Sequence, residues 1–375
     1  MTAFATIPGG APIRVVQVGA GGMGRNWLGA ITANPDVELV GLVDLDLDAA
    51  RAALDALAAS GVPGTHDVVM GRSVADVAAR SGAQAVVNVT VPVAHRPVNE
   101  EALFAGLPVL CEKPAAPTVA EALTQAASAA VAGQLLMISQ SRRYFAALDA
   151  LVAQVGSLGE IGTVDCSFFK APRFGGFREE MDHVLLVDMA IHHFDAARRL
   201  IGSDPVAVYC EEHNPGWSWY RGAANASAVF EFASGARFVY AGSWCAPGAE
   251  TSWNGSWRVS GERGTARWDG DGAPVAHLPP APVETAVLEP RAEETAGALA
   301  EFVDCLRTGR SPGTTAAANV RSLAMVEAAI ASSESGHRVL IDDVVAVSLA
   351  AAREREERPA VRAELDALGA GAFAG

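Results

Sequence analysis

The segment from Ile13 to Gly24, IRVVQVGAGGMG, decides how the chain folds. A short run of β-branched residues ends in glycines, and the next stretch, MGRNWLGAITAN, carries the apolar spacing of a helix. Strand character returns in PDVELVGLVD, so the three segments form a βαβ unit. Strands without polar alternation that are separated by helices predict a parallel sheet covered on both faces.

The turn after the first strand fits the pattern GxGxxG, and its candidate cofactor-binding residues are Gly19, Gly21, Gly22, Met23 and Gly24. Alone, this pattern is as typical of a simple turn as of a phosphate-binding loop. Here it follows a strand, opens a helix and precedes an acidic residue, Asp44, at the end of the second strand. The glycines let a pyrophosphate approach the helix N-terminus.

Asp44 would accept hydrogen bonds from the ribose hydroxyls and repel a 2′-phosphate, so the sequence predicts NAD rather than NADP. The alternative is that Asp44 caps the helix that begins near Leu47. Asp46 and Asp48 are equally suited to that task.

The length of 375 residues predicts two domains, and 50% hydrophobic residues can fill both cores. A net charge of -15 argues against a general nucleic-acid or anionic-membrane surface. The N-terminus lacks the pattern of a signal peptide, and no long apolar run predicts a membrane span, so we expect a cytoplasmic protein. Five scattered cysteines without CxxC spacing predict reduced thiols and no zinc site.

The remaining segments predict an α/β N-terminal domain and an α+β C-terminal domain with a mainly antiparallel sheet. Further apolar strands occur at 83–91, 107–112 and 134–141, and strands with polar alternation follow from Gly162 onward. Helices are expected near 293–307 and 316–335. The predicted division is 1–141, 142–345 and 346–375, the last a charged helix with a mobile glycine-rich end.

Two segments carry candidate catalytic groups. Lys113, in VLCEKPAAPT, follows a buried strand, where parallel sheets bind ligands. In LLVDMAIHHFD, a regular helix would bring Asp188, His192 and Asp195 within about 60° of one another, with His193 on the other side. Such a face fits a metal site, an acid-base device or a buried salt bridge, and the segment alone does not choose among them.

The motifs GAGGMG, VTVPVAH, EKP, SRRYF and DMAIHHFD together resemble the glucose-fructose oxidoreductase and inositol dehydrogenase (Gfo/Idh/MocA) family, over roughly Ile13 to Asp342. The resemblance implies an N-terminal Rossmann domain and a C-terminal domain whose mainly antiparallel sheet is open-faced. The resemblance implies that Lys113, Asp188 and His192 line the site beside the nicotinamide, as an acid-base device and not a metal site. His192 would exchange the hydroxyl proton, Asp188 would orient the imidazole, and Lys113 would polarise the hydroxyl.

Other positions follow from the same resemblance. The expected cofactor contacts also include Thr90, Pro92, His95, Glu112 and Lys113. Arg143 or Tyr144 would bind substrate, or Arg143 would form a salt bridge between the domains. His193 and Asp195 are expected to be structural, with Asp195 paired to Arg198 or Arg199 on its own helix.

The sequence departs from the family pattern in two places. Relatives often have a glycine-rich turn before the catalytic aspartate, whereas this chain has the charged segment from Arg178 to His183, which puts the pocket shape and substrate charge in question. Many relatives have a threonine followed directly by a proline in this loop, whereas here Val91 separates Thr90 from Pro92. Six of the seven tryptophans lie between Trp217 and Trp268, where sugar stacking or, more in keeping with an open sheet, subunit or core packing would explain them.

The resemblance therefore predicts an NAD-dependent oxidoreductase that acts on a secondary hydroxyl or ketone of a sugar, cyclitol or related polyol. We expect a homodimer or homotetramer formed through the C-terminal sheet. Two alternatives stay open: an NAD-dependent glycoside hydrolase that acts by transient oxidation, and a non-catalytic dinucleotide-binding regulator. The presence of Lys113, Asp188 and His192 together argues against the regulator.

Overall fold

The computed structural model describes residues 4–368, and their contacts divide them into two compact units. Unit 1 contains the residues up to Ser141, Ala292–Val320 and the segment that begins at Ser348, whereas unit 2 contains Arg142–Arg291 and Arg321–Val347. The linear three-part division stays a prediction. The predicted mobile end beyond residue 368 lies outside the described residues.

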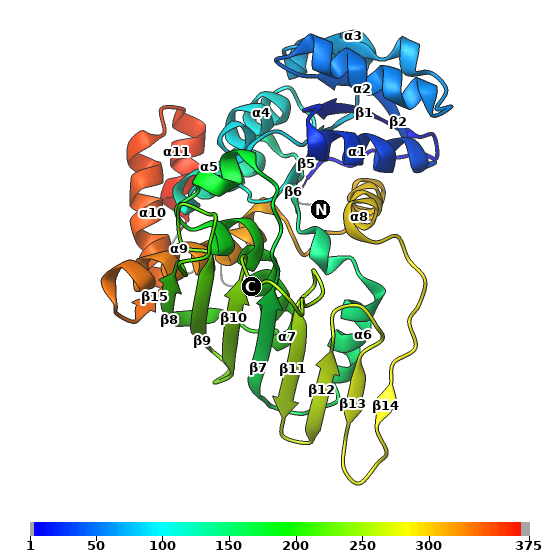
Figure 1. Ribbon diagram of the computed structural model, residues 1–375. Helices are drawn as coiled ribbons and strands as arrows, with labels where there is room; N and C mark the ends of the chain where they lie inside the picture. The colour runs from blue at the N-terminus through cyan, green and yellow to red at the C-terminus, as the bar shows by residue number, and fades with distance from the viewer. Residues whose placement is uncertain (1–3, 369–375) are drawn as a thin grey trace. The chain divides into compact units, whose positions relative to one another are not determined.

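Unit 1 is built on a six-stranded parallel sheet in the order β3-β2-β1-β4-β5-β6 (Figure 1). Its strands are β1 (Ile13–Val18), β2 (Val37–Val43), β3 (Val69–Gly71), β4 (Ala85–Asn88), β5 (Val109–Glu112) and β6 (Leu136–Ser139). This order confirms the predicted Rossmann domain, because the strand order reverses between β1 and β4, where dinucleotides bind. The sequence did not predict β3, whose three residues are only half-buried.

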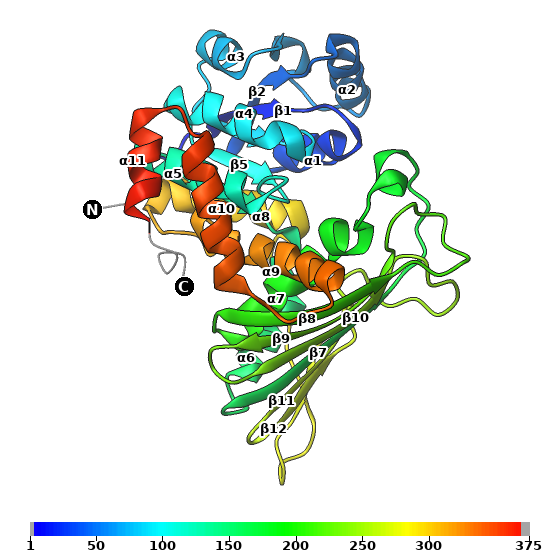
Figure 2. The ribbon, with the colours of Figure 1, turned by 90° about the vertical axis from the view of Figure 1, so that its left-hand side faces the viewer.

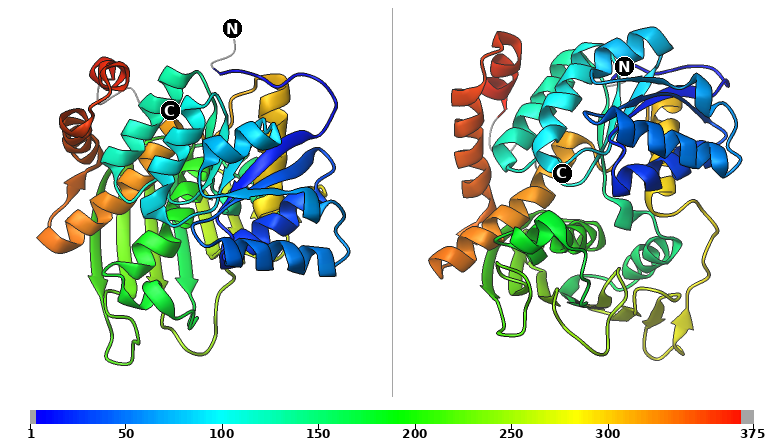
Figure 3. Two further views of the ribbon diagram at one scale, coloured as in Figure 1. Left: turned by 90° about the horizontal axis from the view of Figure 1, so that it is seen from above. Right: turned by 45° about the horizontal axis from the view of Figure 1, so that its top comes forward.

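Helices cover both faces of this sheet (Figure 3). They are α1 (Gly22–Ala33), α2 (Leu47–Ala59), α3 (Val74–Ser81), α4 (Pro92–Phe104) and α5 (Val119–Ala132). Leu28 of α1 and Leu54 of α2 share one buried cluster with Leu42 of β2. On the opposite face, Val77 of α3 packs so closely over Gly41 that a Cβ there would lie 2.5 Å from it. The apolar strands are therefore buried on both sides, as their composition predicts.

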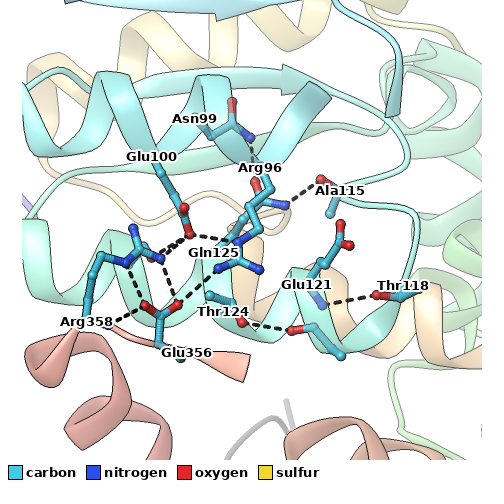
Figure 4. A network of polar contacts seen from close by, with 12 residues as sticks. Arg96, Asn99, Glu100, Ala115, Thr118, Glu121, Thr124, Gln125, Glu356 and Arg358 are labelled. Atoms are coloured by element: carbon cyan, nitrogen blue, oxygen red, sulfur yellow. Dashed lines mark hydrogen bonds and ion pairs between the residues drawn. The ribbon is translucent and has the colours of Figure 1, made fainter. Parts of the chain in front are cut away.

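Later segments of the chain complete unit 1. They include α8 (Glu294–Thr308) and α11 (Pro359–Ala367), which packs against α5. Figure 4 shows a charged network that anchors the entry to α11: Glu356 contacts Arg96 at 3.1 Å and Arg358 at 2.7 Å, and Glu100 contacts both arginines. The side chain of Glu356 is only 2% exposed, so this network fixes the C-terminal segment to α4.

Unit 2 contains a nine-stranded sheet in the order β14-β13-β12-β11-β7-β10-β9-β8-β15 (Figure 1), and Figure 2 shows its strands β7 to β12 from another side. Its strands are β7 (Ile161–Phe169), β8 (Pro205–His213), β9 (Asn225–Phe232), β10 (Arg237–Ser243), β11 (Ser256–Gly261), β12 (Gly264–Trp268), β13 (Val275–His277), β14 (Glu284–Thr285) and β15 (Val339–Leu340). All neighbours are antiparallel except β7 and β10. Buried and exposed residues alternate along β9, which confirms a sheet with one open face.

The helices of unit 2 bury the inner face of that sheet. They are α6 (Ala146–Val155) and α7 (Ile191–Ile201), together with parts of α9 (Ala316–Ser335) and α10 (Ile341–Arg355). A π-helical stretch, Leu185–Ala190, leads directly into α7. None of the described helices combines the length and apolar character that a membrane crossing requires.

Candidate functional site

The glycine-rich turn in unit 1 connects β1 to α1. Gly19 has a φ of 100°, and a Cβ there would lie 2.7 Å from the carbonyl oxygen of Val89. A Cβ on Gly24 would lie 2.3 Å from the Gly19 oxygen, so these two glycines are required for packing. A Cβ on Gly21 or Gly22 would instead meet no atom within 4 Å. The turn thus leaves open space at the N-terminus of α1, where a pyrophosphate fits.

A buried glutamine holds this turn in place. Gln17, in the middle of β1, donates from Nε2 to the carbonyl oxygens of Gly19 at 2.7 Å and Gly24 at 2.8 Å. The sequence analysis did not predict this role. The signal in the sequence is a single amide side chain among the valines of the strand.

Asp44 lies beside the same turn. Its Oδ2 accepts a hydrogen bond from the Ala20 N–H at 2.7 Å, and its Oδ1 accepts one from Asp46 N–H at 2.9 Å. Asp46 caps α2 by accepting from the N–H groups of Asp48 and Ala49, so the alternative role of Asp44 as the cap of α2 is wrong. A carboxylate has about four acceptor sites, so Asp44 keeps capacity for ribose hydroxyls.

The turn after β4 is organised by Asn88. Its Oδ1 accepts hydrogen bonds from the N–H and the hydroxyl of Thr90, at 3.1 and 2.7 Å, while Nδ2 donates to Asn99 at 2.8 Å. Asn99 donates to Gln125, and Gln125 donates to the carbonyl of Ala115 at 2.8 Å, as Figure 4 shows. This chain of buried amides ties the turn after β4 to the loop that follows β5.

His95 makes a second connection between the same two loops. Its Nδ1 lies 2.7 Å from the Pro114 carbonyl oxygen and its Nε2 lies 3.0 Å from the Thr90 carbonyl oxygen. Burial lowers the pKa of His95, and the charge of Lys113 acts in the same direction, while the two carbonyls oppose the shift. The ring has no exposed surface, so these contacts give His95 a supporting position; its contact with the cofactor stays a prediction.

Glu112 also points inward. Its Oε1 accepts from Trp27 Nε1 at 2.8 Å, and its Oε2 accepts from the Lys113 N–H at 3.0 Å. Burial raises the pKa of Glu112, whereas the Trp27 hydrogen bond and the charge of Lys113 limit the rise. Glu112 therefore fixes the backbone of Lys113, whose side chain is half-buried. Pro92, the first residue of α4, completes the predicted set at this edge of the sheet.

In unit 2, the structure gives Asp188 and His192 different settings. Asp188 belongs to the π-helical stretch and accepts a hydrogen bond from Arg178 Nε at 2.8 Å. His192 lies in the first turn of α7 and is 6% exposed. A π-helical turn has more residues than an α-helical one, so the regular 100° phasing assumed from the sequence does not hold across 185–190. π-Helical turns are frequent at functional sites.

Asp195 is part of a buried ion pair. Arg143 donates to it from Nε at 2.5 Å and Nη2 at 2.9 Å, and the Ser322 hydroxyl donates at 2.6 Å. Burial alone would raise the pKa of Asp195, but Arg143 and Ser322 outweigh it and hold the pKa below its usual value. Arg143 is thus the direct hydrogen-bond partner. Of the two expected partners, Arg199 contacts Asp149, whereas the charge of Arg198 also helps to lower the pKa of Asp195. Both partners belong to unit 2, and a substrate contact of Arg143 stays a prediction.

His193 is surrounded by aromatic rings. The ring centroids of Phe168, Tyr240 and Trp257 lie 4.8, 5.6 and 6.2 Å from its own. Burial lowers the pKa of His193 to about 3, and the charge of Arg142 adds to the effect. His193 therefore stays neutral at physiological pH and packs in the core, as expected. Trp244, Trp257 and Trp268 are buried as well, which favours core packing for half of the six tryptophans in this segment.

The charged segment before Asp188 includes a short 3-10 turn, Gly176–Glu180. Arg178 contacts Asp188, Arg221 contacts Asp182 at 2.9 Å, and His183 contacts Glu212 at 2.7 Å. The hydrogen bond with Glu212 raises the pKa of His183. Between residues 4 and 368, no group of three or more histidine, cysteine or acidic side chains has the arrangement of a metal site.

Comparisons with known proteins agree with these features. Residues 13–140 match the family described as oxidoreductase family, NAD-binding Rossmann fold, and residues 145–267 match the GFO/IDH/MocA C-terminal domain. D-apiose dehydrogenase of Paraburkholderia graminis is 28% identical over 86% of this chain and 88% of its own length. Inositol 2-dehydrogenase of Renibacterium salmoninarum is 28% identical over 52% of this chain and 57% of its own.

A solved structure with the same fold is an oxidoreductase from Agrobacterium radiobacter, in complex with NAD+, L-tartaric acid and magnesium. It has a TM-score of 0.80 and 21% identity, and the match covers 88% of this chain and 99% of that one. At this identity the likeness supports the fold alone.

Proposed function

The chain belongs to the Gfo/Idh/MocA family of NAD-binding oxidoreductases, and we propose that its substrate is a sugar, cyclitol or related polyol that reacts at a secondary hydroxyl or ketone. The observation that carries the proposal is the pairing of an NAD-type turn, with Asp44 beside it, and an Asp188-His192 helical segment in one chain. Relatives named D-apiose dehydrogenase and inositol 2-dehydrogenase support the substrate class.

Residues of unit 1 would hold the dinucleotide. The open positions at Gly21 and Gly22 would accept the pyrophosphate against the N–H groups of α1, and Asp44 would accept the ribose hydroxyls. Bound there, NAD takes up the hydride that leaves the substrate carbon. Asp44 would also repel a 2′-phosphate, which is our reason for proposing NAD over NADP.

His192 is the proposed proton acceptor. Removing the hydroxyl proton as the carbon is oxidised requires a base, and an imidazole suits this exchange. Both histidines are buried, His192 with 6% and His193 with 2% exposure, and His193 packs among aromatic rings. Asp188, about one turn earlier, would orient the imidazole and stabilise its protonated form.

Lys113 is the proposed polarising group. An ammonium that donates to the reacting hydroxyl or to its neighbour stabilises the negative charge that develops on oxygen. Two contacts anchor the backbone around Lys113. Oε2 of Glu112 accepts a hydrogen bond from the Lys113 N–H, and His95 contacts the carbonyl oxygen of Pro114. We propose that Lys113, Asp188 and His192 act on the same substrate hydroxyl.

Oligomerisation through the open face of the unit 2 sheet belongs to the same proposal. Tyr209 and Val229, which pair across β8 and β9, are 44% and 42% exposed on that face. Covering them in a homodimer or homotetramer would remove apolar surface from water. A cytoplasmic location is proposed as well, and the five free, buried cysteines are compatible with it.

The test is a panel of sugars, cyclitols and sugar acids offered separately with NAD and NADP, with formation of reduced nicotinamide followed by absorbance. The expected result is net reduction of NAD by at least one member. Matched glycosides in the same panel examine the hydrolase alternative: release of free sugar without net NADH would favour it. Neither NADH nor released sugar across the panel would favour the regulator.

A further inference from the structure

We propose that this enzyme recognises an acidic substrate, a sugar acid, and that Arg178 binds its carboxylate. The inference rests on the proposed function, because it names the substrate class of the same site. It starts from the charged segment between β7 and α7, whose Arg178 is attached to the proposed catalytic Asp188 by a 2.8 Å contact. A substrate group bound at Asp188 would therefore lie close to this guanidinium.

Arg178 keeps donors available for a ligand. Its contact with Asp188 uses Nε, and neither Nη atom hydrogen-bonds to any residue between 4 and 368. An arginine whose two Nη groups remain presents a fork that fits a carboxylate. The side chain is 34% exposed, compared with 13% for Asp188, so the guanidinium is the more accessible of the two charges.

Two aromatic rings hold the guanidinium and face solvent. The centre of the Arg178 guanidinium lies 4.8 Å from the ring of Phe177 and 5.4 Å from that of Phe174. Both rings are more than half exposed, at 56% and 55%. Exposed rings beside a cation supply apolar surface for the C–H face of a pyranose, while the cation takes the acidic group. Phe174 also packs near Trp244 and Trp253, with ring centroids 6.2 Å apart in each case, yet more than half of its surface stays exposed.

Charge balance also favours an anionic ligand at this place. The protein has a net charge of -15, so an acid is repelled by most of its surface and needs a local cation. Lys170 and Arg173 lie on the same connection and carry further positive charge: Arg173 stacks on Trp219 at 3.9 Å, and Lys170 contacts Glu250. Arg178 donates its hydrogen bond to Asp188 from Nε. The Nη side of the guanidinium is left to attract a carboxylate.

The experiment compares each acid with its neutral counterpart. D-Glucuronate with D-glucose, D-galacturonate with D-galactose, and D-gluconate with D-glucitol are titrated into the protein with NADH bound, by calorimetry, and are assayed with NAD. We expect at least one acid to bind and react better than its neutral partner. Arg178→Gln should weaken that acid by about ten- to a hundredfold, the usual effect of losing a charge-assisted hydrogen bond, and leave neutral compounds unchanged.

Two further variants separate recognition from folding. Arg221→Gln removes the same charge from a residue that contacts the same segment, but its partners are Glu180 and Asp182, so the acid preference should persist. Asp188→Asn should abolish turnover yet bind the acid more tightly, because Arg178 loses its internal partner. If Arg178 only forms a structural ion pair with Asp188, neither Arg178→Gln nor Asp188→Asn should change the binding of the acid relative to that of its neutral partner.

The outcomes distinguish this inference from the proposed function. Oxidation of neutral compounds with no acid preferred, or an acid preference unchanged in Arg178→Gln, would overturn the inference and leave the function standing. Binding of an acid that depends on Arg178 but reduces no NAD would support the inference and contradict the function. If no acid binds more tightly than its neutral partner in any pair, Arg178 is not a carboxylate-binding residue.

Discussion

The neighbouring histidines at the start of α7 provide the sharpest test of the proposed chemistry. His192→Asn should keep the fold and NADH affinity, but lose roughly two to four orders of magnitude in turnover, the usual contribution of general acid-base catalysis. That loss corresponds to about 3 to 5 kcal/mol of activation free energy. The adjacent substitution, His193→Asn, should lose much less.

The structure supplies the reason for the contrast. With a pKa of about 3, His193 would be protonated in roughly one molecule in 10⁴ at pH 7, so it is a poor proton acceptor. Its ring packs against those of Phe168, Tyr240 and Trp257 and is only 2% exposed. Replacing it with asparagine buries an amide among aromatic rings and should cost about 1 to 3 kcal/mol of stability. His193→Phe avoids that amide and serves as the packing control.

The assay is NADH formation with a substrate identified in the panel, at saturating and limiting concentrations. Circular dichroism and thermal melting of each variant report whether the fold is intact. The reasoning is refuted if folded His193→Phe has no turnover while His192→Asn retains it. Equal losses in both folded variants would show that the packing around His193, and not proton transfer, controls the rate.

Three further predictions concern the cofactor, the buried ion pair and the C-terminal anchor. Asp44→Ala should weaken NADH binding and reduce the preference for NADH over NADPH, as measured by calorimetry; wild-type protein that prefers NADPH would contradict the assignment. Asp195→Asn, which removes the buried carboxylate that Arg143 contacts, should cost about 3 to 5 kcal/mol at pH 7 in urea unfolding. The pKa of Asp195 is lower in the folded protein than the unfolded value of about 3.9, so its ionised carboxylate stabilises the fold fully above that value. This stabilisation is lost as the pH falls through the folded pKa, so the free energies of unfolding of the wild type and Asp195→Asn should converge in acid. Glu356→Gln should lower the melting temperature and expose α11 to proteolysis, whereas Glu357→Gln, at an exposed neighbour, should do neither.

The parts of the fold that depend on local patterns were predictable. Apolar strands ending in glycine identified the parallel sheet, and the spacing of Thr118 and Glu121 fits a capping box at the start of α5, where the Thr118 side chain accepts from the Glu121 N–H. The predicted helices at 293–307 and 316–335 appear as Glu294–Thr308 and Ala316–Ser335. Such signals persist in a single sequence because turns, caps and periodicity involve residues close together in the chain.

Contacts between distant residues were not predictable in the same way. Trp27 bonds to Glu112 across 85 positions, and Arg143 reaches Asp195 across 52. The π-helical stretch also escaped, because its wider turn depends on surroundings and not on a residue pattern; this is why regular phasing grouped Asp188 with Asp195. In the structure, Asp188 contacts Arg178 and Asp195 contacts Arg143.

The two halves of the proposed chemistry are supported in physically different ways. Around the nucleotide edge, His95, Asn88 and Gln125 fix the loops through buried contacts to backbone atoms, so a change at any of them leaves an uncompensated polar group in the interior. The segment that carries Arg178 has a short 3-10 turn and exposed rings, and substitutions there disturb little of the core. Residues that serve every substrate are therefore held rigidly, whereas the residue proposed to select the substrate lies where the sequence can vary at low cost in stability.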